Sequence, residues 1–259
     1  MSKDKLNLTL RLLYKEPATL SFETFAKNEA MAESFKIEKI SESDVELIVK
    51  IDDHKAIFKK LQGKTEFDYD ALKVQAKLFK GQDFFTFRHE AYDESKDHTN
   101  YIEVSVETDA EESFLQIQAL FFAAMYQTDA QPPVGVHILE NDVMLSFGDF
   151  TEFGINQINA WPMYCAWFNI YAVEKKDKVT IYTKGNKKLG EPELEIKVKK
   201  KKMAIATKFL LNLTMGSLST TSSYHDGETT TNVLEGKDYE FVVKKSKFID
   251  GKVLELEKW

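Results

Sequence analysis

Leucine occupies every second position near the start of the chain. Leu6, Leu8, Leu10 and Leu12 alternate with mostly polar residues, and a period of two places one face of an extended strand against a core. Other short apolar runs, separated by turn residues, indicate further strands. Together these patterns predict strands at residues 6–14, 45–51, 55–61, 101–107, 134–139, 163–173, 178–183, 239–243 and 253–257.

Helices are predicted where apolar residues recur at intervals of three and four. Asp109 and Glu112 have the form of a capping box, in which each side chain satisfies an otherwise unpaired backbone N–H at a helix start. The helix behind them is apolar around most of its circumference, so we expect it to be central. The predicted helices span residues 21–35, 68–80, 109–126, 147–158 and 203–216, with an extended piece at 189–198 and a Ser/Thr-rich loop at 217–232.

The order of these elements predicts an α+β fold with mixed or antiparallel sheets and helices on one face. Residues 6–107 have the order β-α-β-β-α-β, which is that of a ferredoxin-like, split βαβ unit. We therefore expect an N-terminal unit at residues 1–108 and a C-terminal α+β unit at residues 109–259, closely packed on the first. A single continuous domain is the alternative, because no flexible linker separates the halves.

Composition places the protein among ordinary globular chains. Hydrophobic residues make up 43% of the 259 positions and charged residues 30%, so the core needs no metal or disulfide to hold it together. The single cysteine, Cys165, cannot form an internal disulfide, which fits a reducing compartment. The chain begins without a signal-peptide pattern and contains no long apolar run. These features predict a cytoplasmic location, no membrane span and no cofactor.

Charge argues against sequence-specific nucleic-acid binding. The first 130 residues hold 25 acids against 17 bases. Arg11 and Arg88 are the only arginines, and every other base is lysine. The chain therefore lacks the forked donors that grip phosphates and base edges.

The C-terminal half resembles a bacterial family classed as a domain of unknown function. The resemblance rests on INAWPMYCAWFNIYAV, TKGNKKLGEPELEI and YHDGETT, and the opening LRLLYKEPATLSFETF is similar to the start of that family. It covers most of the chain and implies a bacterial, intracellular protein. Its motifs mark a strand entry and turns, and the resemblance implies no activity.

One acidic loop has a metal-like composition. His89, Asp93 and His98 offer imidazole and carboxylate ligands within a short stretch. The loop has no cysteine and matches no zinc spacing, so a solvated surface loop is the favoured interpretation and a metal site is the alternative.

Two segments are candidates for binding a partner. The lysines of the KVKKKK run precede a predicted helix, where positive charge opposes the helix dipole, and they could attract an acidic partner. Aromatic residues concentrate between residues 161 and 171, and exposed aromatics anchor interfaces. A solvated edge and ordinary core packing are the competing interpretations. The candidate partner-binding residues are Trp161, Trp167, Tyr171, Lys199, Lys200, Lys201 and Lys202.

The catalytic signatures that sequence motifs reveal are absent, so a noncatalytic protein-binding module is the leading hypothesis. An immunity-like protein that neutralises a toxin is one subtype. The alternative is an enzyme or small-ligand-binding protein whose site is assembled from dispersed residues, because catalytic groups often converge only in the fold. Under that alternative, His89, His98, His137 and His225 would line a pocket.

Overall fold

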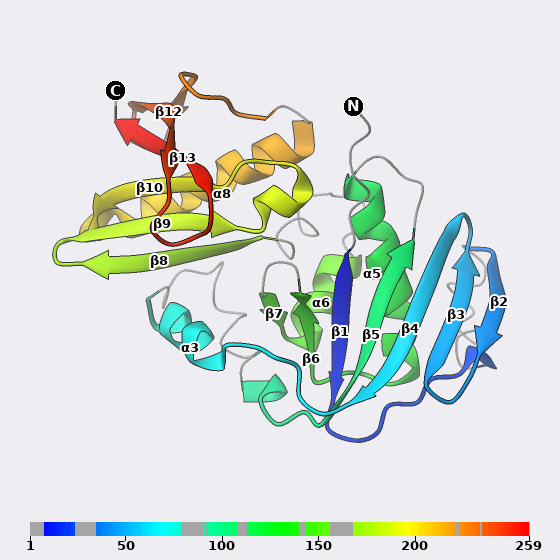
Figure 1. The fold of residues 1–259 in the computed structure, drawn as a ribbon. Helices are drawn as coiled ribbons and strands as arrows, with labels where there is room; N and C mark the ends of the chain where they lie inside the picture. The colour runs from blue at the N-terminus through cyan, green and yellow to red at the C-terminus, as the bar shows by residue number, and fades with distance from the viewer. Residues whose placement is uncertain are drawn as a thin grey trace. The chain divides into compact units, whose positions relative to one another are not determined.

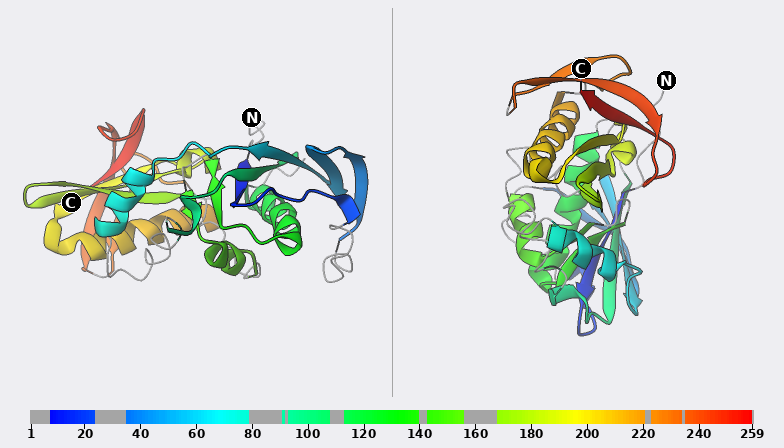
Figure 2. Two further views of the ribbon diagram at one scale, coloured as in Figure 1. Left: turned by 90° about the horizontal axis from the view of Figure 1, so that it is seen from below. Right: turned by 90° about the vertical axis from the view of Figure 1, so that its left-hand side faces the viewer.

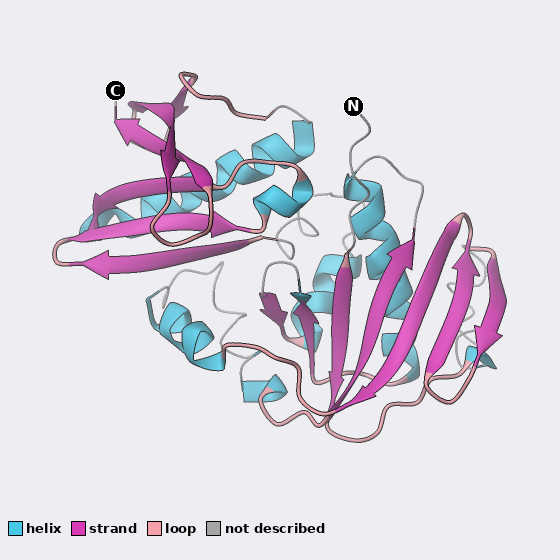
Figure 3. Ribbon diagram, in the orientation of Figure 1, coloured by secondary structure: helices cyan, strands magenta, loops and turns pink. Residues whose placement is uncertain are grey.

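The chain forms two compact units, Met1–Ala166 and Trp167–Trp259 (Figure 1). The computed structural model describes residues 8–23, 35–78, 91, 93–107, 113–139, 143–155, 168–220, 223–233 and 235–258. Each unit contains one β-sheet with helices beside it, as the secondary-structure colouring in Figure 3 shows. The predicted α+β class with mixed and antiparallel sheets is confirmed.

The first unit is built on a seven-stranded sheet with the strand order β2-β3-β4-β5-β1-β6-β7. Every strand pair described in it is antiparallel. Its strands are β1 (Thr9–Tyr14), β2 (Ile37–Glu42), β3 (Glu46–Ile51), β4 (His54–Gln62), β5 (Asn100–Glu107), β6 (Gly135–Ile138) and β7 (Val143–Leu145).

Helices cover one face of this sheet. Helix α5 (Ser113–Ala130) packs on β4, β5 and β1, and α6 (Phe147–Ile155) packs on β6 and β7. A third helix, α3 (Tyr69–Leu78), follows β4. Leu10 and Leu12 are fully buried, whereas Arg11 between them is partly exposed. Because side chains alternate along a strand, Arg11 lies on the face opposite the apolar core.

The boundary between the units differs from the predicted one at residues 108 and 109. Strand β6 pairs with β1, and α5 packs on the same sheet, so both belong to the first unit. The strand order also differs from a ferredoxin-like sheet, where the first strand would lie between the third and fourth strands of the predicted unit. Here β5 lies between β4 and β1.

The second unit contains a six-stranded sheet with the order β11-β12-β13-β10-β9-β8. The pair β10 and β13 is parallel, and the others described are antiparallel. Its strands are β8 (Asn169–Lys175), β9 (Lys178–Lys184), β10 (Leu194–Lys199), β11 (Thr229–Asn232), β12 (Lys237–Lys245) and β13 (Lys252–Lys258).

Helix α8 (Met203–Thr220) packs on β9 and β10 and supplies the core of the second unit (Figure 2). Leu210 on the helix and Ile181 on β9 are fully buried. Two short 3-10 turns flank β10, namely η3 (Asn186–Leu189) and η4 (Lys200–Lys202).

Most predicted elements lie within one to four residues of the observed ones where the structure describes them. The backbone N–H of Ala71 donates to Asp68 Oδ1 at 2.8 Å, so Asp68, the first residue of the predicted helix at 68–80, caps α3. Strands β2, β7 and β11 were not predicted. The predicted capping box and residues 24–34 of the first predicted helix lie outside the described residues. Among the described helices, none is long and apolar enough to cross a membrane.

Candidate functional site

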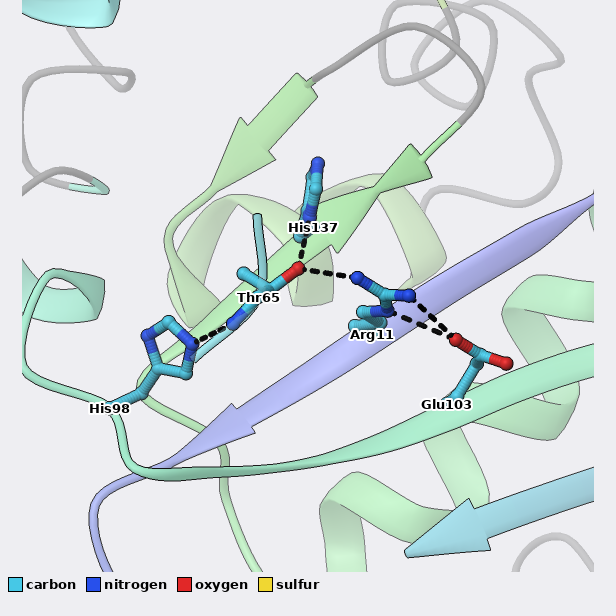
Figure 4. Close-up of polar contacts among 5 residues, drawn as sticks. All are labelled: Arg11, Thr65, His98, Glu103 and His137. Atoms are coloured by element: carbon cyan, nitrogen blue, oxygen red, sulfur yellow. Dashed lines mark hydrogen bonds and ion pairs between the residues drawn. The ribbon is translucent and has the colours of Figure 1, made fainter. Parts of the chain in front are cut away.

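Thr65 is the centre of a polar network on the face of the first sheet opposite Leu10 and Leu12 (Figure 4). Arg11 Nη1 donates to Thr65 Oγ1 at 2.8 Å, and the same oxygen lies 2.8 Å from Nδ1 of His137. The backbone N–H of Thr65 donates to Nε2 of His98 at 2.8 Å. Four segments of the chain thus meet at one threonine: β1, β6, the loop after β4 and the loop before β5.

The hydrogen bonds define the tautomer of His98. Nε2 accepts a backbone N–H, so it carries a lone pair and the ring proton is on Nδ1. Nδ1 then donates to the carbonyl oxygen of Ser95 at 2.7 Å. Burial lowers the pKa of His98, and the nearby Lys64 charge lowers it further, against the opposing effect of the Ser95 carbonyl. His98 is therefore neutral and holds the residue 65 loop against residues 95–98.

Arg11 connects the network to a row of alternating charge. Its Nε and Nη2 atoms both lie 3.0 Å from Oε2 of Glu103, and its guanidinium lies 4.8 Å from the centroid of the Tyr101 ring. Glu103 is paired in register with Lys59, which in turn is paired with Glu46. Opposite charges on directly facing positions stabilise neighbouring strands, so this row supports the sheet.

Thr65 and His137 have the spacing of a nucleophile and its base, but they are closed off from solvent. Thr65 is 4% exposed and His137 is 2% exposed. Thr65 Oγ1 accepts from Arg11 and forms a second hydrogen bond with His137 Nδ1. Phe67 packs edge-on against the His137 ring with centroids 5.0 Å apart. The arrangement holds the loop in place, and only its Arg11 and Glu103 end reaches the surface.

The predicted metal ligands are only partly within the described residues. His98 uses both ring nitrogens in the contacts above, and exposed Asp93 forms an ion pair with Lys96 at 3.1 Å. His89 lies outside the described part of the chain. In that described part, no three His, Cys, Asp or Glu side chains are grouped to hold a metal ion. His98 and Asp93 are thus engaged with other groups.

His98 should make stability depend on pH. Because its folded pKa is lowered, its hydrogen bonds contribute fully above the ordinary histidine value of about 6.5 and are lost as pH falls through the folded pKa. We expect the free-energy difference between wild type and His98→Gln, measured by urea unfolding, to shrink between pH 8 and pH 5. His225→Gln, in an exposed turn, is the control. An unchanged difference would contradict the neutral tautomer.

The lysine run lies at the end of β10 and in the turn η4. Lys199 is the last residue of β10, and Lys200, Lys201 and Lys202 form η4 before α8 begins. Lys200 Nζ lies 2.7 Å from Oε2 of Glu174. Lys202 forms an ion pair with Glu235 and lowers the pKa of that carboxyl. Two lysines of the run are therefore fixed by acids, while Lys199 and Lys201 are exposed.

The β8–β9 hairpin brings further lysines to the same place. Cross-strand register pairs Lys175 with Lys178 and Lys178 with Lys199. The backbone N–H of Lys200 donates to the carbonyl oxygen of Asp177 at 2.9 Å, which ties η4 to the hairpin turn. We call this exposed cluster the lysine tip; it consists of Lys175, Lys176, Lys178, Lys199, Lys200 and Lys201.

Of the predicted aromatic anchors, only Tyr171 is described, because Trp161 and Trp167 lie outside the described residues, as does Cys165. Tyr171 stacks on Tyr182 with ring centroids 5.6 Å apart, and Tyr182 stacks on Phe248 at 5.4 Å. Tyr171 is half-buried in this row. The Tyr171 ring is thus part of a stacked row of aromatic rings with Tyr182 and Phe248.

Two motifs behind the family resemblance are structural. In the TKGNKKLGEPELEI segment, the buried Glu193 carboxylate accepts from Thr183 Oγ1 at 2.7 Å and from the backbone N–H of Gly185 at 2.8 Å and of Lys187 at 3.2 Å. In YHDGETT, Asp226 and Gly227 form a turn in which Gly227 has φ 80°. Both segments shape loops of the second unit.

No family model, curated protein or solved structure matches this chain. The resemblance to a bacterial family of unknown function therefore stays a prediction.

Neither the polar network around Thr65 nor the lysine tip was predicted as a cluster from the sequence. Arg11, Thr65 and His137 belong to separate segments, and nothing in their spacing along the chain brings them together. The hairpin lysines gave a clearer signal, because the predicted strands at residues 163–173 and 178–183 are separated by the polar residues EKKD, which indicate a turn.

Proposed function

We propose that this protein is a noncatalytic protein-binding module and that the lysine tip is its contact surface. The observation that carries the proposal is the convergence of two lysine-rich segments, residues 175–178 and 199–201, on one exposed edge of the second unit. The fold of this unit does not need these charges, because its core is supplied by α8 and the buried faces of β9 and β10. Charged surfaces of this kind speed and orient association with an oppositely charged partner.

The proposal includes a bacterial, cytoplasmic setting, which the family resemblance and the single cysteine support. An immunity-like role is its most specific form. In that role, the acidic first 130 residues, with 25 acids against 17 bases, suit a basic toxin, while the lysine tip suits an acidic partner surface.

Affinity purification tests the proposal. The tagged full chain, used as bait in the native cell at moderate salt, should capture a protein partner in stoichiometric amount. Replacing Lys175, Lys178 and Lys199 with serine should reduce recovery at least about tenfold, since each charge pair across an interface contributes on the order of 0.5 to 1 kcal/mol.

The matched control replaces Lys245, Lys247 and Lys252 with serine. These three lysines are also exposed and belong to the second unit, at the β12–β13 hairpin. Equal losses for the two triple variants would show a general charge effect and remove the lysine tip from the proposal.

A small-ligand site is the second candidate, and the convergence of His98, His137 and Arg11 on Thr65 favours it. Because Thr65 and His137 are closed off from solvent, a ligand would contact the network at its partly exposed Arg11 and Glu103 end. An empty affinity purification would favour this candidate over protein binding.

A further inference from the structure

We infer that the binding surface is composite: the β8–β9 hairpin and residues 199–201 form it together, with Lys178 of the hairpin at its centre. We infer further that it recognises a carboxylate-rich surface of a partner protein. This inference rests on the proposed protein-binding function and names the residues and the partner chemistry of that same site. The hairpin lysines Lys175, Lys176 and Lys178 were not among the predicted partner-binding residues.

The lysine tip contains a row of like charges in direct cross-strand register. Lys178 on β9 faces Lys175 on β8 and Lys199 on β10. Like charges on directly opposite positions destabilise a sheet. Three consecutive strands therefore carry an arrangement that weakens the fold locally and that a single acidic residue would relieve.

Lys176 adds a second local cost. Its φ of 58° lies in the left-handed region, where a residue with a Cβ is disfavoured and glycine or asparagine is the usual choice. Lys175 and Lys178 form the register pair that closes this two-residue turn. Lys176 thus adds a positive charge to the tip at a position where the backbone favours another residue.

One ion pair and one backbone hydrogen bond hold the parts of the tip together. Glu174 pairs with Lys200, and the Asp177 carbonyl accepts the backbone N–H of Lys200. These contacts connect η4 to the hairpin. Among the ion pairs of the described residues, none involves the remaining lysines of the tip, Lys175, Lys176, Lys178, Lys199 and Lys201. Their charges are directed to solvent and available to a partner.

The chemistry of the tip fits protein carboxylates. The chain has only two arginines, Arg11 and Arg88, so the second unit has no guanidinium fork to grip phosphates. Lysine ammonium groups suit separate carboxylates on a folded surface.

The test is the charge reversal Lys178→Glu, measured for both stability and binding. We expect Tm to rise by about 2 °C, because the new carboxylate faces two lysines. Binding to polyglutamate, measured by anisotropy at 150 mM salt, should weaken at least about tenfold. Lys178→Ser should weaken binding in the same direction without the full gain in Tm.

Lys252→Glu is the matched control. Lys252 faces Lys245 in the same kind of lysine pair on β12 and β13, so its reversal should also raise Tm but change polyglutamate binding less than about twofold. Equal losses of binding for the two reversals, or a lower Tm for Lys178→Glu, would overturn the inference.

Two comparisons complete the test. The first distinguishes a carboxylate partner from nucleic acid or lipid, and the second distinguishes failure of the composite surface from failure of the protein-binding function. Tighter binding of duplex DNA or phosphatidylserine vesicles than of polyglutamate, lost in Lys178→Glu, would replace the carboxylate partner. If Lys178→Glu still captures the cellular partner in full, the composite surface is wrong while the protein-binding function stands. If no partner is captured by wild type, the function itself fails.

Discussion

Thr65→Val should lower the free energy of unfolding by about 2 to 3 kcal/mol, because it removes the hydroxyl at the centre of the polar network while keeping its volume. Arg11 Nη1 and His137 Nδ1 each lose a hydrogen bond of 2.8 Å. Both groups are at least partly buried, and a buried polar group without its partner costs more than the bond itself contributes. Urea unfolding followed by tryptophan fluorescence measures the loss.

Thr65→Ser is the matched control, because serine keeps the hydroxyl and loses only a methyl group. It should remain within about 1 kcal/mol of wild type. A value for Thr65→Val within about 0.5 kcal/mol of wild type would mean that the network does not hold the loop after β4 in place.

Glu193→Ala should destabilise the protein by about 3 kcal/mol or more. Glu193 is 6% exposed, and removal of its carboxylate leaves the backbone N–H groups of Gly185 and Lys187 and the hydroxyl of Thr183 without their acceptor. Hydrogen bonds to an ionised acceptor are stronger than neutral ones. Thermal and urea unfolding should both show the loss.

Glu195→Ala separates this effect from the removal of any buried carboxylate. Glu195 lies two residues along β10 and is 7% exposed. Burial raises the pKa of its carboxyl, and the hydroxyl of Ser246 donates to it at 3.0 Å. The surrounding groups stabilise the ionised carboxylate of Glu195 poorly, so we expect Glu195→Ala to lower the free energy of unfolding by less than about 1 kcal/mol. Equal losses at the two positions would refute the special role of Glu193.

The regular elements were predictable because their apolar residues follow a clear period. Strand β1 and helix α8 show it directly. The missed strands lack that signal. Five of the six residues of β2 are exposed, and a register shift between Lys39 and Ser41 interrupts its pairing with β3. Strand β11 is the sequence TTTN within a Ser/Thr-rich stretch, and β7 has only three residues.

The pairing of strands was less predictable than their positions. The N-terminal elements suggested a split βαβ unit because their order along the chain allows it. The sheet instead pairs β4 with β5, so that β1 lies between β5 and β6 and not beside β4. Register of this kind depends on contacts between residues about 90 to 130 positions apart, as in the pair of Leu12 with Ile102, and local periodicity does not encode them.

The polar network around Thr65 and the lysine tip differ in how much of each could be predicted from the sequence. Alternation around Leu10 and Leu12 places Arg11 on the polar face, but Thr65 lies in a loop and its partners come from other strands. More of the lysine tip could be predicted, because the KVKKKK run was a candidate surface and the hairpin lysines lie between two predicted strands, at residues 163–173 and 178–183. What was missing was the register that pairs Lys178 with Lys199.

The position of β13 between β12 and β10 has a consequence for the synthesis of the protein. The last strand described lies inside the second sheet and forms its parallel pair with β10. During translation, β8, β9, β10 and α8 leave the ribosome first, but the pair formed by β11 and β12 cannot join β10 until residues 252–258 have emerged, because β13 lies between β12 and β10. The second unit therefore completes its sheet late, and a ribosome that stalls before residue 252 leaves an open strand edge on β10 for chaperones to protect.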